Sequence, residues 1–221
     1  MLTLAILSQK GGAGKTTLSF NLAIAAEQDH QTTVLIDLDP QASATQIGDM
    51  READAPSILS VQATRLTNTL EAATDNGAQI AIIDTAPHSE RDALAATKAA
   101  NLVLIPCRPT ILDLNAIKRT VELVELAKTP ALGILSAVPP VGKAGEEAIE
   151  VLKHYGLPYC PTPLIQRAAY MHALTCGMGV LEYEPKGKAA HEVKQVYKFV
   201  KKHVNKLVCQ HAYTKELVDA T

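Results

Sequence analysis

Short apolar runs alternate with amphipathic stretches along most of the 221-residue chain. This alternation restricts the fold more than any other feature, because each run is apolar at consecutive positions, as strands buried on both faces are. A succession of strands and helices requires right-handed crossovers and produces a parallel sheet covered by helices on both sides. We therefore predict an α/β fold with a doubly wound, mostly parallel sheet. The predicted strands are residues 2–8, 33–37, 79–84, 102–106 and 132–137, and the predicted helices are residues 15–27, 64–74, 91–99, 114–127, 146–154 and 188–208.

A glycine-rich segment, residues 8–17, joins the first predicted strand to the first predicted helix. Glycines at this place let backbone N–H groups turn inward around phosphate oxygens, a lysine reaches the outer phosphates, and a hydroxyl binds Mg²⁺. The segment fits the pattern G-x-x-x-x-G-K-[ST], except that Gln9 replaces the first glycine. A dinucleotide site is disfavoured because Thr17 follows where a third glycine would be required. We predict the phosphate loop of a P-loop NTPase fold, formed by Gly11, Gly12, Ala13, Gly14, Lys15, Thr16 and Thr17.

A second lysine, Lys10, stands at the start of this loop. It cannot easily reach the phosphates that Lys15 reaches, but it could reach a nucleotide held by a facing subunit. The alternative is a glycine-rich turn with incidental lysines. The strand before the loop and the helix after it disfavour that alternative.

Three aspartates follow predicted strands. Asp37 and Asp39 end one strand and Asp84 ends another, and in a doubly wound sheet these ends share the edge of the phosphate loop. Asp84 comes after four apolar residues, as the Mg²⁺-holding carboxylate of P-loop nucleotidases does. Of Asp37 and Asp39, one can support the metal while the other orients the attacking water; acids of surface turns are the alternative. The sequence has no Asn-Lys-x-Asp guanine-reading motif, so ATP is favoured over GTP.

At this point the sequence resembles a known family. Residues 10–17 and 37–41 resemble the deviant Walker A ATPases of the ParA/MinD group, and most of all the small ParA-type partition ATPases without an N-terminal helix-turn-helix domain. Residues 105–110 look like the family's proline-containing segment, and residues 177–189 like its G-x-x-V-x-x-Y-x-P-x-x-K-A segment. The resemblance covers about residues 1–208. We predict one domain over 1–208, and the lack of a clear periodicity beyond Val208 predicts a flexible tail at 209–221.

The resemblance implies a role for each residue of the site. Lys15 would bind the β- and γ-phosphates, Thr16 the Mg²⁺ and Thr17 the α-phosphate; Lys10 would cross the interface of an ATP-sandwich dimer; Asp39 would position water, with Asp37 and Asp84 around the metal. It also implies slow, partner-stimulated hydrolysis of ATP. Such a protein acts as a switch first and as a catalyst second.

The basic residues concentrate near the end of the chain. The net charge is only −2, but residues 186–206 hold seven lysines and one acid. At about 100° per residue, a stripe of apolar residues opposes a face of lysines on the predicted terminal helix. The stripe consists of Ala189, Val193, Val196, Tyr197, Val200 and Val204, and the opposite face of Lys194, Lys198, Lys201, Lys202 and Lys206.

This lysine face can be interpreted in two ways. It can bind DNA phosphates without sequence preference, with an affinity that falls as salt rises. It can also be a solvated face whose charge suits the helix C-terminus. Resemblance to ParA proteins favours DNA, and an aromatic content of 4% without Trp disfavours single-strand recognition. The candidate DNA-binding residues are Arg167, Lys186, Lys194, Lys198, Lys201 and Lys202.

Other classes of site and location are disfavoured. The four cysteines include no C-x-x-C pair, so a zinc site or a disulfide framework is not expected, and the plain reading is free thiols in a reducing cytosol. No run approaches the roughly 18 apolar residues of a membrane span, and the valine-rich stripe is a weak insertion face. His88 is a minor candidate in a nucleotide-sensing loop. We expect a cytoplasmic protein that associates with the nucleoid when ATP is bound.

Together these features predict an ATP-dependent DNA segregation switch. ATP with Mg²⁺ would join two copies into a homodimer, the dimer would hold nonspecific double-stranded DNA, and a ParB-like adaptor protein would stimulate hydrolysis and release. The alternative is a ParA-like ATPase that positions or recruits a protein assembly or DNA-transfer machinery. A metabolic kinase is disfavoured because Lys10 has no role in a monomeric kinase.

Overall fold

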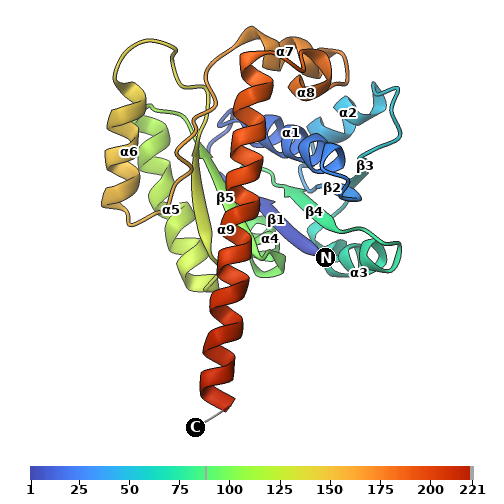
Figure 1. The fold of residues 1–221 in the computed structure, drawn as a ribbon, viewed down its shortest axis with the longest axis vertical. Helices are drawn as coiled ribbons and strands as arrows, with labels where there is room; N and C mark the ends of the chain where they lie inside the picture. Colours follow the sequence, from blue (N-terminus) through green and yellow to red (C-terminus); the bar gives the residue numbers. More distant parts are fainter. Residues whose placement is uncertain (88, 220–221) are drawn as a thin grey trace.

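The predicted strands assemble side by side in the computed structural model, which describes residues 1–87 and 89–219 and side-chain surroundings up to residue 207. Together with one strand that was not predicted, β3, they form a six-stranded sheet in the order β3-β2-β4-β1-β5-β6, in which every pairing is parallel. The prediction of a doubly wound parallel sheet is thereby confirmed (Figure 1). The strands are β1 Leu2–Ile6, β2 Thr33–Asp37, β3 Ser57–Ser60, β4 Ile80–Asp84, β5 Leu102–Cys107 and β6 Ala131–Leu135.

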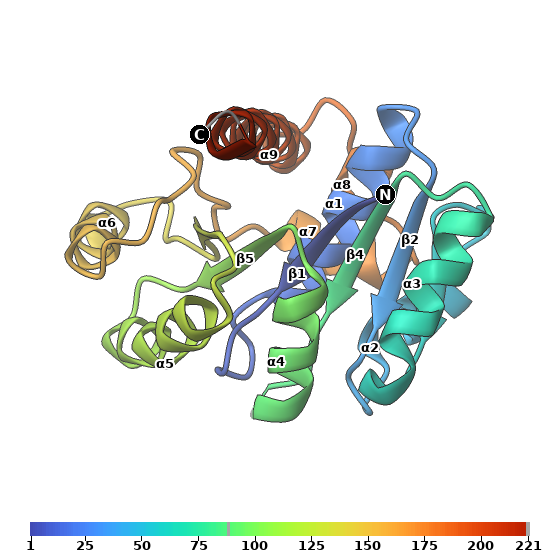
Figure 2. The ribbon, with the colours of Figure 1, turned by 90° about the horizontal axis from the view of Figure 1, so that it is seen from below.

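Helices cover both faces of this sheet, as Figure 2 shows in a view along it. Helices α1 and α9 lie on one face, and α3, α4 and α5 lie on the other (Figure 2). The helices are α1 Lys15–Gln28, α2 Ser43–Asp49, α3 Leu66–Asp75, α4 Glu90–Ala99, α5 Ile111–Ala127, α6 Ala144–His154, α7 Ala168–Thr175, α8 Val180–Tyr183 and α9 Lys188–Asp219, with a short 3₁₀ turn at Ala63–Arg65. Among the described residues, no helix is both long enough and apolar enough to cross a membrane.

The core divides into two layers because consecutive strand residues point to opposite faces. In β1, Leu4 and Ile6 pack in the layer beneath α1 and α9, whereas Ala5 packs in the layer beneath α3, α4 and α5. Ile82 and Ile83 of β4 divide in the same way. Both faces are buried, which explains why these strands read as continuous apolar runs rather than as alternating patterns.

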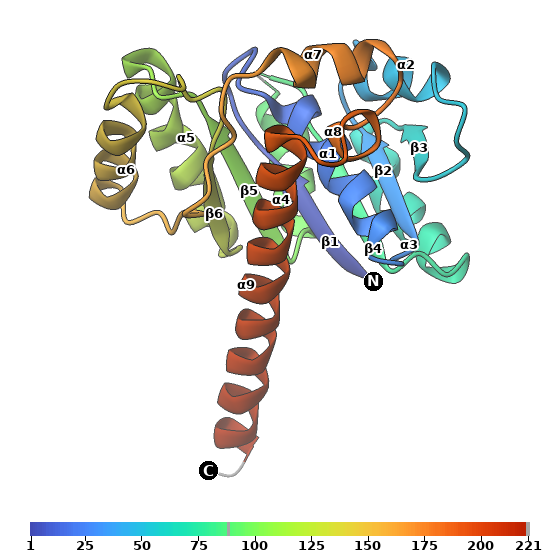
Figure 3. The same ribbon diagram turned by 45° about the horizontal axis from the view of Figure 1, so that its top comes forward.

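Several elements were not predicted from the sequence. Strand β3 is a four-residue edge strand with mostly exposed side chains, so its sequence carries little apolar signal. Helices α2, α7 and α8 are short. Helix α9 begins at Lys188, as predicted, but continues to Asp219 beyond the predicted end at 208, and its C-terminal half projects past the rest of the molecule (Figure 3). The division of the chain into one domain and a tail stays a prediction.

Candidate nucleotide-binding site

The loop between β1 and α1 has the shape of an anion cradle. Gly12 and Gly14 have φ angles of 73° and 94°, in the left-handed region where a side chain is strained. Nothing among the described residues lies within 4 Å of the place where a Cβ on Gly11 or Gly12 would stand. The backbone N–H groups there are open to a ligand at the start of α1, where the helix dipole favours negative charge. The structure thus places the predicted loop where phosphates can bind.

Lys15, the first residue of α1, is held within this loop. Its side chain is buried, and its Nζ donates to the backbone oxygen of Lys10 at 3.3 Å. Burial lowers the pKa of Lys15, while the nearby carboxylates of Asp84 and Asp39 raise it. On the other side, Ser136 Oγ donates to the oxygen of Ala13 at 2.7 Å and ties the loop to the segment after β6. The ammonium therefore stands between the loop and two acids, within reach of the place where phosphates would bind.

Asp84 and Thr16 together offer a place for a divalent cation. Asp84 is 1% exposed, and its Oδ1 has no hydrogen-bond partner within the part of the chain that the structure describes. Burial raises its pKa to about 7, which the nearby Asp37 reinforces and a hydrogen bond from Thr16 opposes. An unpartnered carboxylate oxygen beside a hydroxyl suits a hard, oxygen-seeking ion such as Mg²⁺.

No group of three or more His, Cys, Asp or Glu in the described ranges is arranged to hold a metal by itself. Mg²⁺ is commonly held by one or two protein ligands together with substrate phosphates and water, and Asp84 and Thr16 offer two oxygen ligands of this kind. The residues present therefore fit that ion.

Asp37 lies in register with Asp84 but has different surroundings. Its Oδ1 accepts a hydrogen bond from the N–H of Asp39 at 3.0 Å, and its Oδ2 accepts from the N–H groups of Ala44 at 2.9 Å and Thr45 at 3.1 Å. Burial raises the pKa of Asp37, whereas these three hydrogen bonds lower it. The metal-ligand role of Asp37 stays a prediction; in the structure its two carboxylate oxygens hold the loop after β2 and the start of α2.

Asp39 stands at the open end of that loop. Its Oδ1 accepts a hydrogen bond from the N–H of Gln41 at 2.9 Å, and its charge acts on Lys15. The side chain also lines a cavity of about 790 Å³, together with Arg65 of the 3₁₀ turn and Arg91 of α4. Asp39 is therefore a carboxylate with free space beside it, which is the setting that a water-positioning residue needs.

A smaller cavity of about 340 Å³ opens on the far side of the loop. Its lining residues come from the phosphate loop, from the segments after β5 and β6, and from α7. They are Gly14, Thr17, Arg108, Ser136, Ala137, Leu164, Ile165, Gln166, Arg167, Tyr170, Met171 and Leu174. Sequence reasoning missed most of these residues, although the strand ends before Arg108 and Ser136 share the edge of the phosphate loop, which is a usable signal.

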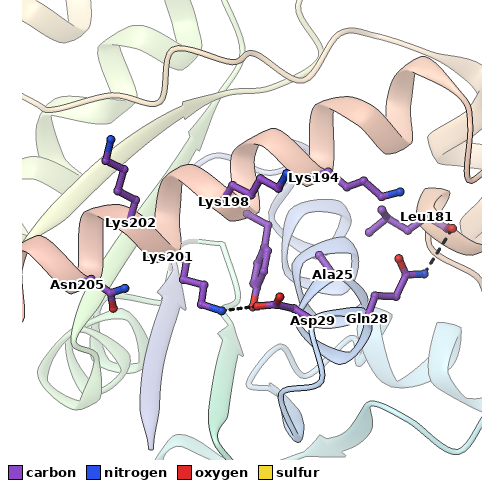
Figure 4. Close-up of a pocket in the computed structure, with 10 residues that line it drawn as sticks. Ala25, Gln28, Asp29, Leu181, Lys194, Lys198, Lys201, Lys202 and Asn205 are labelled. Atoms are coloured by element: carbon purple, nitrogen blue, oxygen red, sulfur yellow. Dashed lines mark hydrogen bonds and ion pairs between the residues drawn. The ribbon is translucent and has the colours of Figure 1, made fainter.

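The predicted DNA-binding residues fall into two groups. The apolar stripe of α9 is buried, and Lys194, Lys198, Lys201 and Lys202 lie on its outer side, around a groove of about 610 Å³ between α9 and α1. Figure 4 shows Lys201 turned to Asp29, with which it forms an ion pair, while Lys202 points away.

The remaining two candidates lie outside this lysine group. Lys186 is exposed just before α9. Arg167 is instead bound by Glu192 and lines the 340 Å³ cavity, so the structure separates it from the lysines. His88 lies outside the described residues.

Comparison with known proteins agrees with this geometry. Residues 4–164 match the family model of the CobQ/CobB/MinD/ParA nucleotide binding domain. The maintenance of carboxysome distribution protein A of Gloeobacter kilaueensis is 31% identical and covers 91% of this chain and 93% of its own length. The chromosome partitioning protein ParA of Caulobacter vibrioides is 35% identical over 51% of each chain.

A solved structure of apo McdA from Cyanothece has the same fold. It superposes with a TM-score of 0.71 at 24% identity, and the match covers 88% of this chain and 98% of that one. The family model spans well over half of the sequence. The chain therefore belongs to the CobQ/CobB/MinD/ParA family of nucleotide-binding domains.

Proposed function

We propose that this chain is a ParA-type ATPase that uses ATP and Mg²⁺ as a switch to position a protein assembly. The phosphate loop carries this proposal, because its lysine, its hydroxyl and an unpartnered carboxylate oxygen meet at one sheet edge. The similarity to a protein named for carboxysome distribution, over almost its whole length, favours positioning over partition. The match to the partition ATPase ParA extends over about half of each chain.

In this proposal the nucleotide binds across the start of α1. The backbone of Gly11, Gly12, Ala13 and Gly14 holds the phosphates, Lys15 binds the β- and γ-phosphates, and Thr17 binds the α-phosphate. Thr16 and Asp84 hold Mg²⁺. The bound ion neutralises charge that develops on the phosphate oxygens during transfer. The base and sugar extend into the cavity beside Thr17 and Ser136.

Hydrolysis then depends on Asp39. Its carboxylate orients water toward the γ-phosphate, and Asp37 supports it by holding the loop in place. The cavity that Asp39 lines leaves the water in contact with solvent. We expect hydrolysis to be slow in the isolated protein and to be stimulated by an adaptor.

Lys10 supplies the link between two copies. Its carbonyl accepts a hydrogen bond from Lys15 Nζ, so its backbone lies beside the phosphate-binding lysine. From there its side chain reaches the nucleotide of a facing subunit. ATP is thus buried between two chains, and the homodimer forms only in its presence.

The lysine face of α9 holds the dimer on nonspecific double-stranded DNA. Its positive charge gathers on the outside of a helix whose apolar face is buried in the core. Pairing two chains doubles the number of phosphate contacts, and affinity rises steeply with that number. The protein is then associated with the nucleoid when ATP is bound.

Nucleotide-binding and DNA-binding measurements on the purified chain test this function. Retention of DNA should require ATP and Mg²⁺ and should be lost with ADP. The Lys15→Ala variant should bind neither nucleotide nor DNA. DNA binding that is equal without nucleotide would contradict the switch.

Partition of DNA by a ParB-like adaptor is the second candidate, supported by the similarity to ParA. Deletion of the gene in its host separates the two candidates. Mislocalised protein assemblies with normal inheritance of every replicon support positioning, whereas loss of a plasmid or chromosome supports partition.

A further inference from the structure

Glu192 is a buried acid on the inner side of α9. The residue is 8% exposed, and both of its carboxylate oxygens are fully used. Oε1 accepts from Nε and a terminal nitrogen of Arg167 at 2.9 and 2.6 Å. Oε2 accepts from the N–H of Ile165 at 3.1 Å and from the hydroxyl of Tyr170 at 3.3 Å. Such a buried, charge-assisted network holds its members in one geometry.

All three partners of Glu192 belong to the wall of the 340 Å³ cavity beside the phosphate loop. Ile165 and Arg167 lie in an irregular segment, and Tyr170 lies in the first turn of α7. Backbone hydrogen bonds tie this segment to Val138, after β6, on one side. The carboxylate of Glu192 ties it to α9 on the other side. Without Glu192, the second of these supports is lost.

The chemistry of Tyr170 agrees with a permanent network. Burial and the neighbouring Glu192 raise the pKa of the phenol. The hydroxyl therefore keeps its proton and remains a donor to the carboxylate. Arg167 stays charged because the bound carboxylate raises its pKa.

We propose that Glu192 is a positioning residue for the base and sugar of the bound nucleotide. It does not touch the nucleotide. It fixes the wall against which the base and sugar pack. The phosphates lie in the adjoining cradle formed by Gly11–Gly14 and Lys15, whereas the hydrogen bonds of Glu192 go to Ile165, Arg167 and Tyr170 on the opposite part of the wall, so Glu192 acts on a nucleotide but not on a bare polyphosphate. This inference rests on the nucleotide site of the proposed function.

Two titrations with the purified full chain test the proposal. The first measures the Kd of Mg²⁺–ATP, and the second measures the Kd of Mg²⁺–tripolyphosphate, which has phosphates but no base. In Glu192→Gln, one carboxylate oxygen is replaced by an NH₂ group that cannot accept. We expect the Kd of ATP to rise about tenfold, which corresponds to roughly 1.4 kcal/mol. The Kd of tripolyphosphate should stay within about twofold of the wild-type value.

A matched control is Glu122→Gln, which neutralises an exposed glutamate on α5 and should leave both constants unchanged. Arg167→Gln removes the charged partner of Glu192 and should reproduce the selective loss of affinity for ATP. If Glu192→Gln does not fold, Tyr170→Phe offers a second test because it removes a single hydroxyl. It should raise the Kd of ATP by about threefold and leave the Kd of tripolyphosphate unchanged.

Two results would overturn the proposal. An equal loss for both ligands would show that Glu192 only stabilises the fold. Unchanged ATP affinity in Glu192→Gln and Arg167→Gln would show that the cavity wall keeps its geometry without the Glu192–Arg167 interaction. Failure of the proposed function itself is visible separately, because wild-type protein would then bind no ATP or would hold DNA without it.

Discussion

Asp37 and Asp84 stand opposite each other in register at the carboxyl ends of β2 and β4, yet their carboxylates have opposite surroundings. Asp37 accepts hydrogen bonds from three backbone N–H groups, whereas Oδ1 of Asp84 has no partner within the described ranges. Two like charges this close compete, and the acid with fewer donors keeps its proton to higher pH. Asp37 therefore holds the backbone around it, whereas Asp84 keeps one carboxylate oxygen free to bind a cation.

The pKa of Asp84 predicts a pH dependence of stability. Because its folded pKa is about 7, above the ordinary value of 3.8, the folded state holds the proton more tightly than the unfolded state does. The free energy of unfolding of the ligand-free protein should therefore fall as pH rises from about 4 to about 7. In Asp84→Asn, the decrease in the free energy of unfolding that Asp84 causes between about pH 4 and pH 7 should disappear. Urea unfolding at several pH values measures both curves, and parallel curves would contradict the raised pKa.

Ionisation of Asp84 should also govern the binding of Mg²⁺. A metal ligand must be deprotonated, so the affinity for Mg²⁺–ATP should rise as pH increases through about 7. Asp84→Asn should weaken binding and remove this rise. Calorimetric titration between about pH 6 and pH 8 tests it, with ATP in EDTA as the metal-free control. An identical pH profile in the variant would assign the effect to another group.

Asp37 should matter for folding more than for metal binding. Asp37→Ala leaves the N–H groups of Asp39, Ala44 and Thr45 without their acceptor. We expect the free energy of unfolding to fall by about 2–4 kcal/mol. Asp39→Ala, two residues away, should cost less than about 1 kcal/mol because its carboxylate accepts one local bond. Similar losses in both variants would mean that Asp37 does not anchor the loop.

Asp39→Ala should separate binding from hydrolysis. The variant retains Lys15, Thr16 and Asp84, so it should bind Mg²⁺–ATP with nearly wild-type affinity. Without the carboxylate that orients water, turnover should fall by about 10²-fold or more. We expect the ATP-bound dimer to persist and to stay on DNA. Light scattering and phosphate release measure the two effects, and a monomeric variant in excess ATP would contradict the sandwich dimer.

Sequence reasoning succeeded where a strand and its chemistry coincide. Residues 33–37 and the aspartates after them could be placed because a buried parallel strand must be apolar and because its end faces the phosphate loop. It failed for the wall of the smaller cavity, which α7 and an irregular segment form from residues with no periodic pattern. The hydrogen bonds of Glu192 to Arg167 and Tyr170 join positions 25 and 22 residues apart, respectively. No local pattern encodes such pairs.

The lysines of α9 show the same limit of sequence reasoning, because the ion-pair partner of such a lysine can come from another part of the chain. The spacing of the lysines places them correctly on one face, but charge alone cannot show which are already paired. Lys201 donates to Asp29 at the end of α1, and Arg167 is bound by Glu192. Both of their partners are far away in sequence. Only the folded chain distinguishes these two cations from Lys198 and Lys202, which form no ion pair with the residues that the structure describes.

The exposed lysines of α9 should set the salt dependence of DNA binding. Lys198→Glu/Lys202→Glu should weaken ATP-dependent DNA binding and lower the slope of log K against log salt by about 2. Lys98→Glu/Lys118→Glu on α4 and α5 changes the net charge equally on the other face of the sheet, and it should leave the slope unchanged. Asp29→Asn releases Lys201 and should raise the slope by up to about 1. Fluorescence anisotropy across a salt series measures all three variants. Equal slopes in both double variants would assign the lysines of α9 to solubility, and binding to another surface.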